Sequence, residues 1–300
     1  MIEATGVSKS FGSLEALKKA SLKVDKGSVY GIVGSNGAGK TTLLKILAGI
    51  YQQDQGEVRI GGEGVFENVK VKEKIQFIPD VLYFFAQHSI EDMAQYYRMI
   101  YPTWNEERYQ LLFNVFQIDR KKKVTSLSKG MQRQVAFWLA LSTMPEILIL
   151  DEPLDGLDPV MRKKVKKLII DDIVERELTV LISSHNLREL EDLCDHIGIL
   201  HQGDLFLQRE LDDLKKEIHK VQIAFQGDLP DGIMDQEGIL YHEKRGSVSL
   251  FVVRGEQQEI LQHFQQFQPL LLDLLPLTLD EIFIYEMGGM GYVVEELVAE

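Results

Sequence analysis

The chain has 300 residues, 45% of them apolar, and a formal net charge of −13 at pH 7. This length suffices for two domains or for one domain with an appendage. No run approaches the roughly 20 consecutive apolar residues of a membrane-spanning helix, and we expect no secretory signal, because the first residues lack a charged-then-apolar order. Cys194 is the only cysteine, which excludes an intrachain disulfide.

The negative charge is concentrated near the C-terminus. Residues 205–300 carry 7 basic and 18 acidic side chains, whereas residues 1–204 carry 26 and 28. An acidic segment argues against nucleic-acid binding through that part of the chain. We therefore expect no nucleic-acid partner, and we predict two domains, at 1–205 and 206–300, the second being an acidic accessory domain.

The first predicted elements are strands within residues 1–33, where apolar and polar residues alternate between turns at Gly12-Ser13 and Asp25–Ser28. Residues 29–33 are apolar and predict a buried strand. A glycine-rich segment follows, and a helical pattern then continues to about Gly49. The segment reads Gly34-Ser35-Asn36-Gly37-Ala38-Gly39-Lys40-Thr41-Thr42.

This glycine-rich segment fits G-x-x-x-x-G-K-[ST] at every fixed position, between a strand and a helix, which is the context of a phosphate-binding loop. Its glycines allow the backbone N–H groups of residues 34–42 to surround an anion at a helix N-terminus. We expect Lys40 to reach the β- and γ-phosphates and the Thr41 hydroxyl to bind Mg²⁺. The segment predicts a nucleoside triphosphate site.

The next predicted elements are a short antiparallel strand at 55–60, a strand at 74–79 and helices over 88–120, broken at Pro102 and capped at Thr103 or Asn105. From residue 128 helices and strands alternate. The predicted helices cover 132–143, 160–176 and 186–194, and the predicted strands cover 146–150, 178–183 and 196–201. This alternation predicts an α/β fold with a mainly parallel sheet. A helix at 211–219 and strands at 221–225 and 248–253 predict a small α+β extension.

Two carboxylates, Asp151 and Glu152, follow the apolar strand at 146–150. In P-loop proteins the strand beside the phosphate loop ends near the metal, so we expect this strand to lie there. Asp151 would then hold Mg²⁺ through water, and Glu152 would polarise the attacking water. A helix N-cap is the alternative role for the two carboxylates, and the phosphate loop upstream disfavours it.

A family resemblance emerges from Leu127-Ser128-Lys129-Gly130-Met131, which resembles the LSGGQ signature of the ATP-binding-cassette (ABC) ATPases. Gly156-Leu157-Asp158 is similar to the D-loop of that family, and His185 to its switch histidine. Phe11 stands where the family places an aromatic ring that stacks on adenine. The resemblance covers roughly residues 1–205 in the family's order and spacing.

The resemblance implies an ATP site shared by two cassettes. One cassette binds ATP in its phosphate loop, and the facing cassette contributes Ser128 and Gly130 of its signature loop. Asp158 of the D-loop is a further predicted nucleotide-binding residue. His185 would contact the γ-phosphate, with Glu152 as the catalytic base. The implied fold is that of a P-loop NTPase with an antiparallel β subdomain and a helical subdomain at about 84–145.

Three positions depart from the family pattern. Asp80 stands where the family has a glutamine that ligates Mg²⁺ or water, Lys129 replaces a glycine, and Met131 replaces a glutamine. We expect Asp80 still to accept from metal or water, and Lys129 to add positive charge near the γ-phosphate. None of these changes affects the predicted catalytic groups, so we expect an active ATPase. Those groups are Lys40, Asp151, Glu152 and His185.

The resemblance is to separate nucleotide-binding subunits of transporters, and it favours a bacterial exporter, with an importer as the alternative. It implies a permease on another chain and a location at the cytoplasmic face of the membrane. Residues 81–85 lie where the family docks its membrane partner, although packing inside the helical subdomain is the alternative for each side chain. Residues 277–283 look like the closing motif of exporter-type extensions, with a short helix capped by Thr278. The dimer can be a homodimer or a heterodimer with another cassette.

A soluble cassette ATPase acting on ribosomes or DNA is the alternative function. Ribosome-acting relatives usually carry two cassettes and a basic linker, whereas this chain has one cassette and an acidic tail. DNA-acting relatives insert long coiled coils between phosphate loop and signature, and the segment between Lys40 and Ser128 is short. A non-hydrolysing regulatory binder is disfavoured by the presence of Glu152 and His185.

Overall fold

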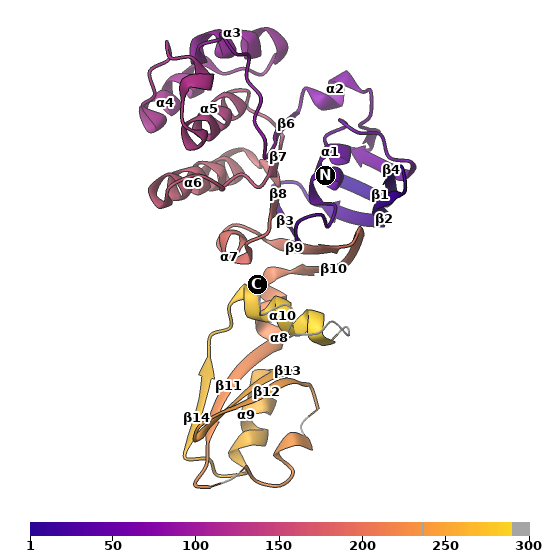
Figure 1. Cartoon of the computed structure of the whole chain (residues 1–300), viewed down its shortest axis with the longest axis vertical. Helices are drawn as coiled ribbons and strands as arrows, with labels where there is room; N and C mark the ends of the chain where they lie inside the picture. The colour runs from indigo at the N-terminus through magenta and orange to yellow at the C-terminus, as the bar shows by residue number, and fades with distance from the viewer. Residues whose placement is uncertain (228, 236, 290–300) are drawn as a thin grey trace. The chain divides into compact units, whose positions relative to one another are not determined.

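The computed structural model describes residues 1–227, 229–235 and 237–289. The chain divides into two compact units, which can be followed in Figure 1. The first unit comprises Met1–His185 and Asp192–Gln208, and the second comprises Asn186–Glu191 and Arg209 onward. The predicted split at residue 205 stays a proposal, and the second unit differs from it by including Asn186–Glu191.

A six-stranded sheet in the order β10-β9-β3-β8-β7-β6 forms the centre of the first unit. Its strands are β3 (Val29–Val33), β6 (Ile75–Ile78), β7 (Ile147–Asp151), β8 (Thr179–Ser184), β9 (His196–His201) and β10 (Asp204–Glu210). β3 pairs in parallel with β8 and β9, and β7 pairs in parallel with β6 and β8. The predicted mainly parallel sheet is confirmed. β3, β7 and β8 are buried along their whole length, as expected for strands covered on both faces.

The strand that ends in the two carboxylates does not lie directly beside the strand that precedes the phosphate loop. β8 lies between them, with Ser183 opposite both Ile32 of β3 and Asp151 of β7. Sequence order alone does not give this strand order, because crossover connections decide which strands become neighbours. Parallel strands nevertheless end at the same edge of a sheet, so Asp151 still lies at the edge where the phosphate loop begins.

An antiparallel sheet in the order β2-β1-β4-β5 flanks α1 (Lys40–Leu47). Its strands are β1 (Ile2–Phe11), β2 (Leu14–Val24), β4 (Gln55–Ile60) and β5 (Glu63–Gly64), and the short helix α2 (Val69–Lys72) follows. Ile2, Leu43 and Ile149 belong to one buried cluster, so this sheet, α1 and the parallel sheet share a core. The predicted antiparallel subdomain is confirmed.

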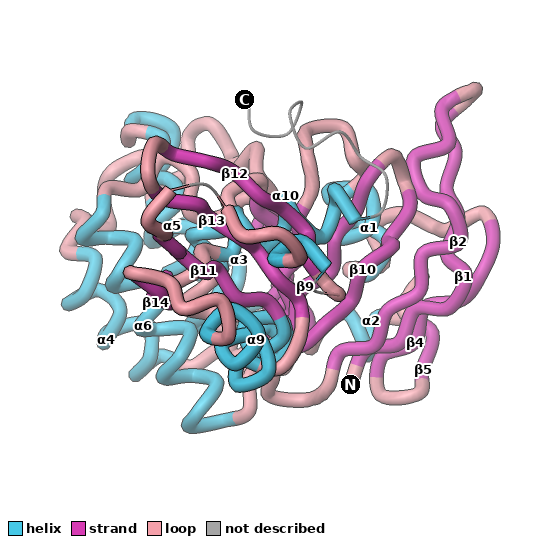
Figure 2. The backbone as a smooth tube through the Cα atoms, turned by 90° about the horizontal axis from the view of Figure 1, so that it is seen from below, coloured by secondary structure: helices cyan, strands magenta, loops and turns pink. Residues whose placement is uncertain are grey.

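A helical layer is inserted between β6 and β7. It contains α3 (Ile90–Ile100), α4 (Glu106–Phe116), the 3₁₀ turn η1 (Val124–Ser126) and α5 (Lys129–Ser142), and α6 (Pro159–Arg176) follows β7. Asn105 caps α4, which confirms one of the two predicted alternatives for this cap. Trp138 is fully buried and stacks on Tyr109 with ring centroids 4.9 Å apart. Figure 2 shows α3–α6 on one side of the first unit and β1, β2, β4 and β5 on the other.

The second unit contains an antiparallel sheet in the order β12-β13-β11-β14. Its elements are β11 (Ile218–Ala224), β12 (Ile239–Arg245), β13 (Val248–Arg254), β14 (Leu271–Leu275), α7 (Leu187–Leu190), α8 (Leu211–Glu217), α9 (Gln257–Gln265), α10 (Leu279–Gly289) and the 3₁₀ turn η2 (Ile233–Asp235). Phe251 packs with Phe264 of α9, and the next residue, Val252, packs with Ile282 of α10. Since successive side chains of a strand point to opposite faces, helices cover both faces of this sheet.

Two predicted helices are shorter than expected. The helix predicted at 186–194 is only α7, because the Asp195 backbone N–H donates to the Val29 carbonyl and the Asp195 carboxylate accepts from the Val29 N–H, which aligns the chain for β9. The helix predicted at 211–219 ends at Glu217, where β11 begins. The Thr278 cap is confirmed, because Thr278 and Glu281 bond to each other reciprocally. No helix in the described part of the chain is long and apolar enough to cross a membrane.

Candidate functional site

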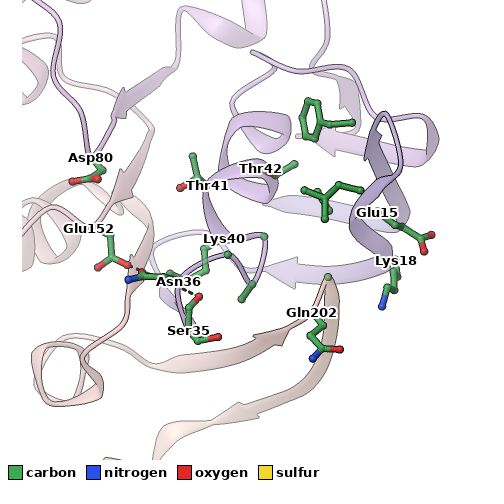
Figure 3. Close-up of a pocket in the computed structure, with 17 residues that line it drawn as sticks. Glu15, Lys18, Ser35, Asn36, Lys40, Thr41, Thr42, Asp80, Glu152 and Gln202 are labelled. Atoms are coloured by element: carbon green, nitrogen blue, oxygen red, sulfur yellow. Dashed lines mark hydrogen bonds and ion pairs between the residues drawn. The ribbon is translucent and has the colours of Figure 1, made fainter. Parts of the chain in front are cut away.

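A pocket of about 630 Å³ lies between the phosphate loop and the first two strands, as Figure 3 shows. Many of the predicted nucleotide-binding residues line it: Phe11, Ser35, Asn36, Gly37, Ala38, Gly39, Lys40, Thr41 and Thr42. Asp80 and Glu152 also line the pocket. In Figure 3 these two carboxylates lie at one end of the pocket, and Glu15 and Lys18 lie at the other.

The loop at residues 34–39 has a conformation that requires glycine at two positions. Gly39 caps α1 with a φ of 110°, in the region that side-chain-bearing residues avoid. A Cβ at Gly34 would lie 2.1 Å from the Leu200 carbonyl oxygen, so no larger residue fits there. Lys40 is 6% exposed, and its Nζ donates to the Gly34 carbonyl at 2.6 Å. The lysine side chain therefore bonds back to the first residue of the loop and stabilises its conformation.

Two hydroxyls hold the carboxylate of Asp151, which is 1% exposed. Thr41 Oγ1 donates to one of its oxygens at 2.7 Å, and Ser183 Oγ donates to the other at 2.7 Å. A buried carboxylate beside a threonine hydroxyl supplies the hard oxygen ligands that Mg²⁺ prefers. Thr41 and Asp151 thus fit the predicted metal site.

The Asp80 carboxylate has a cationic partner that the sequence did not reveal. Arg133 of α5 is buried, and its guanidinium donates to the Pro79 carbonyl at 2.8 Å and to the Asp80 carbonyl at 2.9 Å. The same guanidinium lies 3.3 Å from Asp80 Oδ1. An aspartate therefore complements the charge of Arg133 where the family has a neutral glutamine.

Two predicted catalytic side chains, Lys40 and His185, contact the predicted base Glu152. Lys40 Nζ lies 3.3 Å from Glu152 Oε1, and His185 Nδ1 lies 2.9 Å from Glu152 Oε2. The backbone N–H of His185 also donates to Oε2, at 3.2 Å. Glu152 has a φ of 45°, a left-handed conformation that costs a non-glycine residue about 1 kcal/mol and is frequent at functional sites. Ser183 Oγ accepts from the Glu152 N–H at 3.1 Å and helps to hold this conformation.

Four predicted nucleotide-binding residues do not line this pocket: Gly34, Ser128, Gly130 and Asp158. Ser128 caps α5 by accepting from the Met131 N–H, and Asp158 caps α6 by accepting from two backbone N–H groups at 3.0 Å. A Cβ at Gly130 would lie 2.5 Å from the Gly156 carbonyl oxygen, so the signature segment packs closely against the D-loop segment of the same chain. The assignment of Ser128 and Gly130 to a facing cassette stays a prediction.

Sequence reasoning missed several residues that line the pocket: Leu14, Glu15, Ala16, Lys18, Gln202 and Gly203. The Gly203 N–H donates to the Ala38 carbonyl at 3.0 Å, and the Lys18 N–H donates to the Gly203 carbonyl at 2.8 Å. The turn after β9 therefore bonds directly to the phosphate loop. No local pattern in the sequence indicates this contact. Sequence reasoning also missed Ser183, which donates to Asp151, although its place two residues before His185 could have indicated it.

Comparison with known proteins gives consistent results. Residues 17–155 match the family model of ABC transporters. The chain is 32% identical to the ABC transporter ATP-binding protein YtrB of Bacillus subtilis, over 96% of this chain and 99% of that protein. It is 35% identical to the bacitracin transport ATP-binding protein BcrA of Bacillus licheniformis, over 96% of this chain and 98% of that protein.

Solved structures show the same cassette. The structure of an ATP-binding subunit of an ABC transporter has a TM-score of 0.67 and 25% identity, and it covers 72% of this chain and 92% of that one. A dimeric cassette in a post-hydrolysis state with ADP and Pi has a TM-score of 0.64 and 23% identity, covers 70% of this chain and 99% of that one, and shares the fold. The chain belongs to the ATP-binding subunits of ABC transporters and is an ATP hydrolase of that family.

Proposed function

We propose that this chain hydrolyses ATP to power export through a separate membrane permease, at the cytoplasmic face of the membrane. The full-length similarity to a bacitracin transport subunit supports this role. A linearmycin resistance ATP-binding protein, LnrL of Bacillus subtilis, is a further relative, 30% identical over 68% of each chain. One relative is named for transport of a compound and the other for resistance to one, which favours export of a compound from the cell.

The observation that carries the proposal is the position of Glu152 between Lys40 and His185 at the phosphate end of the pocket. ATP would place its phosphates along residues 34–42 and its base against the exposed ring of Phe11. Glu152 then accepts a proton from the attacking water, and His185 holds the γ-phosphate. Thr41 and Asp151, with Asp80 at the same end of the pocket, would hold Mg²⁺, which would supply positive charge against the phosphates.

The second part of the proposal is a two-cassette site. Ser128, Gly130 and Asp158 lie outside the pocket of their own chain, so they would serve the nucleotide of a facing cassette. The partner is a second copy of this chain or a different cassette. The similarity to a dimeric cassette supports this arrangement.

The permease would contact the exposed apolar segment after Asp80. Val81 and Tyr83 are each 82% exposed, so these two side chains are available to a partner. Phe85 instead packs edge-on against Tyr96 of α3, with ring centroids 5.6 Å apart. A surface of exposed apolar and aromatic side chains is typical of protein interfaces.

Affinity isolation of the tagged chain from native membranes tests this function. We expect a multi-span membrane protein that raises the ATPase rate of the recovered chain. A Val81→Asp/Tyr83→Asp variant should lose this protein and keep its basal rate. Leu270→Asp, at an exposed apolar position in the second unit, should retain it. Recovery of ribosomes or DNA-bound proteins in its place would support the soluble alternative and contradict the transport role.

A further inference from the structure

The segment that follows His185 is built into the C-terminal unit. His185 belongs to the first unit, and the next six residues, Asn186–Glu191, belong to the second. α7 lies within this segment, is capped by Asn186 and packs against α10. A single peptide bond therefore joins the predicted switch histidine to an element that the C-terminal unit holds.

Two ion pairs hold α7 within that unit. Arg188 Nε donates to Asp280 Oδ2 in the first turn of α10 at 2.7 Å. Lys215 Nζ of α8 lies 3.0 Å from Glu191 Oε1. Leu190, between the two charged residues, is fully buried. Both ends of α7 are thus bound to helices of the accessory unit.

The position of the backbone at His185 matters for the catalytic contact. Its N–H and its Nδ1 both bond to the same oxygen of Glu152, at 3.2 and 2.9 Å. A rotamer change can correct the ring position but not the backbone N–H, and hydrogen bonds weaken steeply as distance and angle depart from their optimum. A displacement of α7 would therefore misplace the histidine relative to the catalytic carboxylate.

We propose that α8 and α10 position His185 through α7, so that the C-terminal unit sets the rate of ATP hydrolysis. Arg188, Glu191, Lys215 and Asp280 are positioning residues that do not line the nucleotide pocket. The proposal rests on the function proposed above for His185. It gives the acidic accessory unit a role in turnover that is independent of nucleotide binding.

Charge reversal in the full-length protein tests the proposal. Arg188→Glu and Asp280→Lys should each lower kcat by about two- to fivefold, the range expected from losing an exposed ion pair, with the KM for ATP unchanged. The double variant restores an ion pair of opposite polarity and should recover the wild-type kcat. Arg188 is 72% exposed and Asp280 33% exposed at the side chain, so both reversals leave the core intact.

Arg245→Glu is the matched control. It breaks an exposed pair of the same unit, Arg245 with Glu243 at 2.9 Å on β12, which involves no residue of α7. The control should hydrolyse ATP at the wild-type rate. If an Arg188 or Asp280 variant has a lowered melting temperature, the Lys215–Glu191 pair can be used instead. Its single and double charge reversals allow the same comparison of kcat values.

Wild-type kcat in all the single reversals, or a double variant no faster than the singles, would overturn the proposal. His185→Ala separates this failure from a failure of the proposed function. If His185→Ala hydrolyses ATP normally, the role assigned to His185 is wrong. If it loses activity while the reversals do not, only the positioning role of the C-terminal unit is wrong.

Discussion

Replacing Glu152 by glutamine removes the proposed catalytic base while keeping the size of the side chain. The carboxylate is within 3.3 Å of Lys40 Nζ and 2.9 Å of His185 Nδ1, so it is already placed beside the groups that would bind the γ-phosphate. A positioned general base contributes about 10²- to 10⁴-fold to a rate, equivalent to about 3–5 kcal/mol of activation free energy. We therefore expect kcat to fall by that factor while ATP binding is retained.

The assay is steady-state phosphate release, with nucleotide binding and oligomeric state measured on the same protein. Glu146→Gln is the control, because Glu146 precedes the same strand at its other end, is 49% exposed and pairs with Lys74. It should keep the wild-type rate. A Glu152→Gln rate within tenfold of wild type would refute the assignment of the base. A variant that stays monomeric at saturating ATP and Mg²⁺ would exclude the homodimer and leave the heterodimer.

Three further predictions follow from other contacts. Gly34→Ala should abolish ATP binding and lower the melting temperature, because its Cβ would lie 2.1 Å from a carbonyl oxygen of β9; normal binding in a nucleotide titration would contradict this. Ser183→Ala should cost about 1–3 kcal/mol of unfolding free energy by leaving the buried Asp151 carboxylate without one donor, and an unchanged denaturant midpoint would show that this bond contributes nothing. Burial alone raises the pKa of Glu106, but hydrogen bonds, chiefly from Arg98, lower it from 4.5 to about 2. Because the folded pKa lies below the unfolded one, this stabilisation is present above the unfolded pKa and is lost as the pH falls toward 2. Glu106→Gln should therefore reduce the slope of melting temperature against pH at acid pH. A slope equal to that of the wild type would refute this prediction.

Local patterns were sufficient to predict the phosphate loop and its flanking elements. The apolar run at Val29–Val33, the glycines and the following helical pattern are all adjacent in sequence, and the structure has β3 and α1 at these positions. The Thr278 cap was predicted for the same reason, since its partner Glu281 lies only three residues away. Elements that depend on residues adjacent in sequence can be predicted from the local pattern.

Contacts between distant segments could not be predicted in this way. The order of β3, β8 and β7 depends on crossovers through helices, so local patterns did not give the strand order. The pocket residues Glu15 and Gln202 come together only because the turn after β9 bonds to the phosphate loop. β12 and β14 of the second unit were not predicted, because their burial patterns do not alternate between buried and exposed side chains.

The departure at Asp80 shows how structure can explain a residue that sequence only flags. From the sequence alone, an aspartate in place of glutamine put the metal geometry in question. The structure places its carboxylate against the buried guanidinium of Arg133, on the helix that begins at the signature segment. A change that looks isolated in the sequence is one member of a charged pair.

A nucleotide-bound structure of the Glu152→Gln chain with ATP and Mg²⁺ tests the central claim most directly. The account predicts the triphosphate along residues 34–42, the base against Phe11, the metal ion at Thr41 and Asp151, and Ser128 of a facing cassette at the γ-phosphate. ATP bound elsewhere in the chain, with the phosphate loop open to solvent, would contradict it.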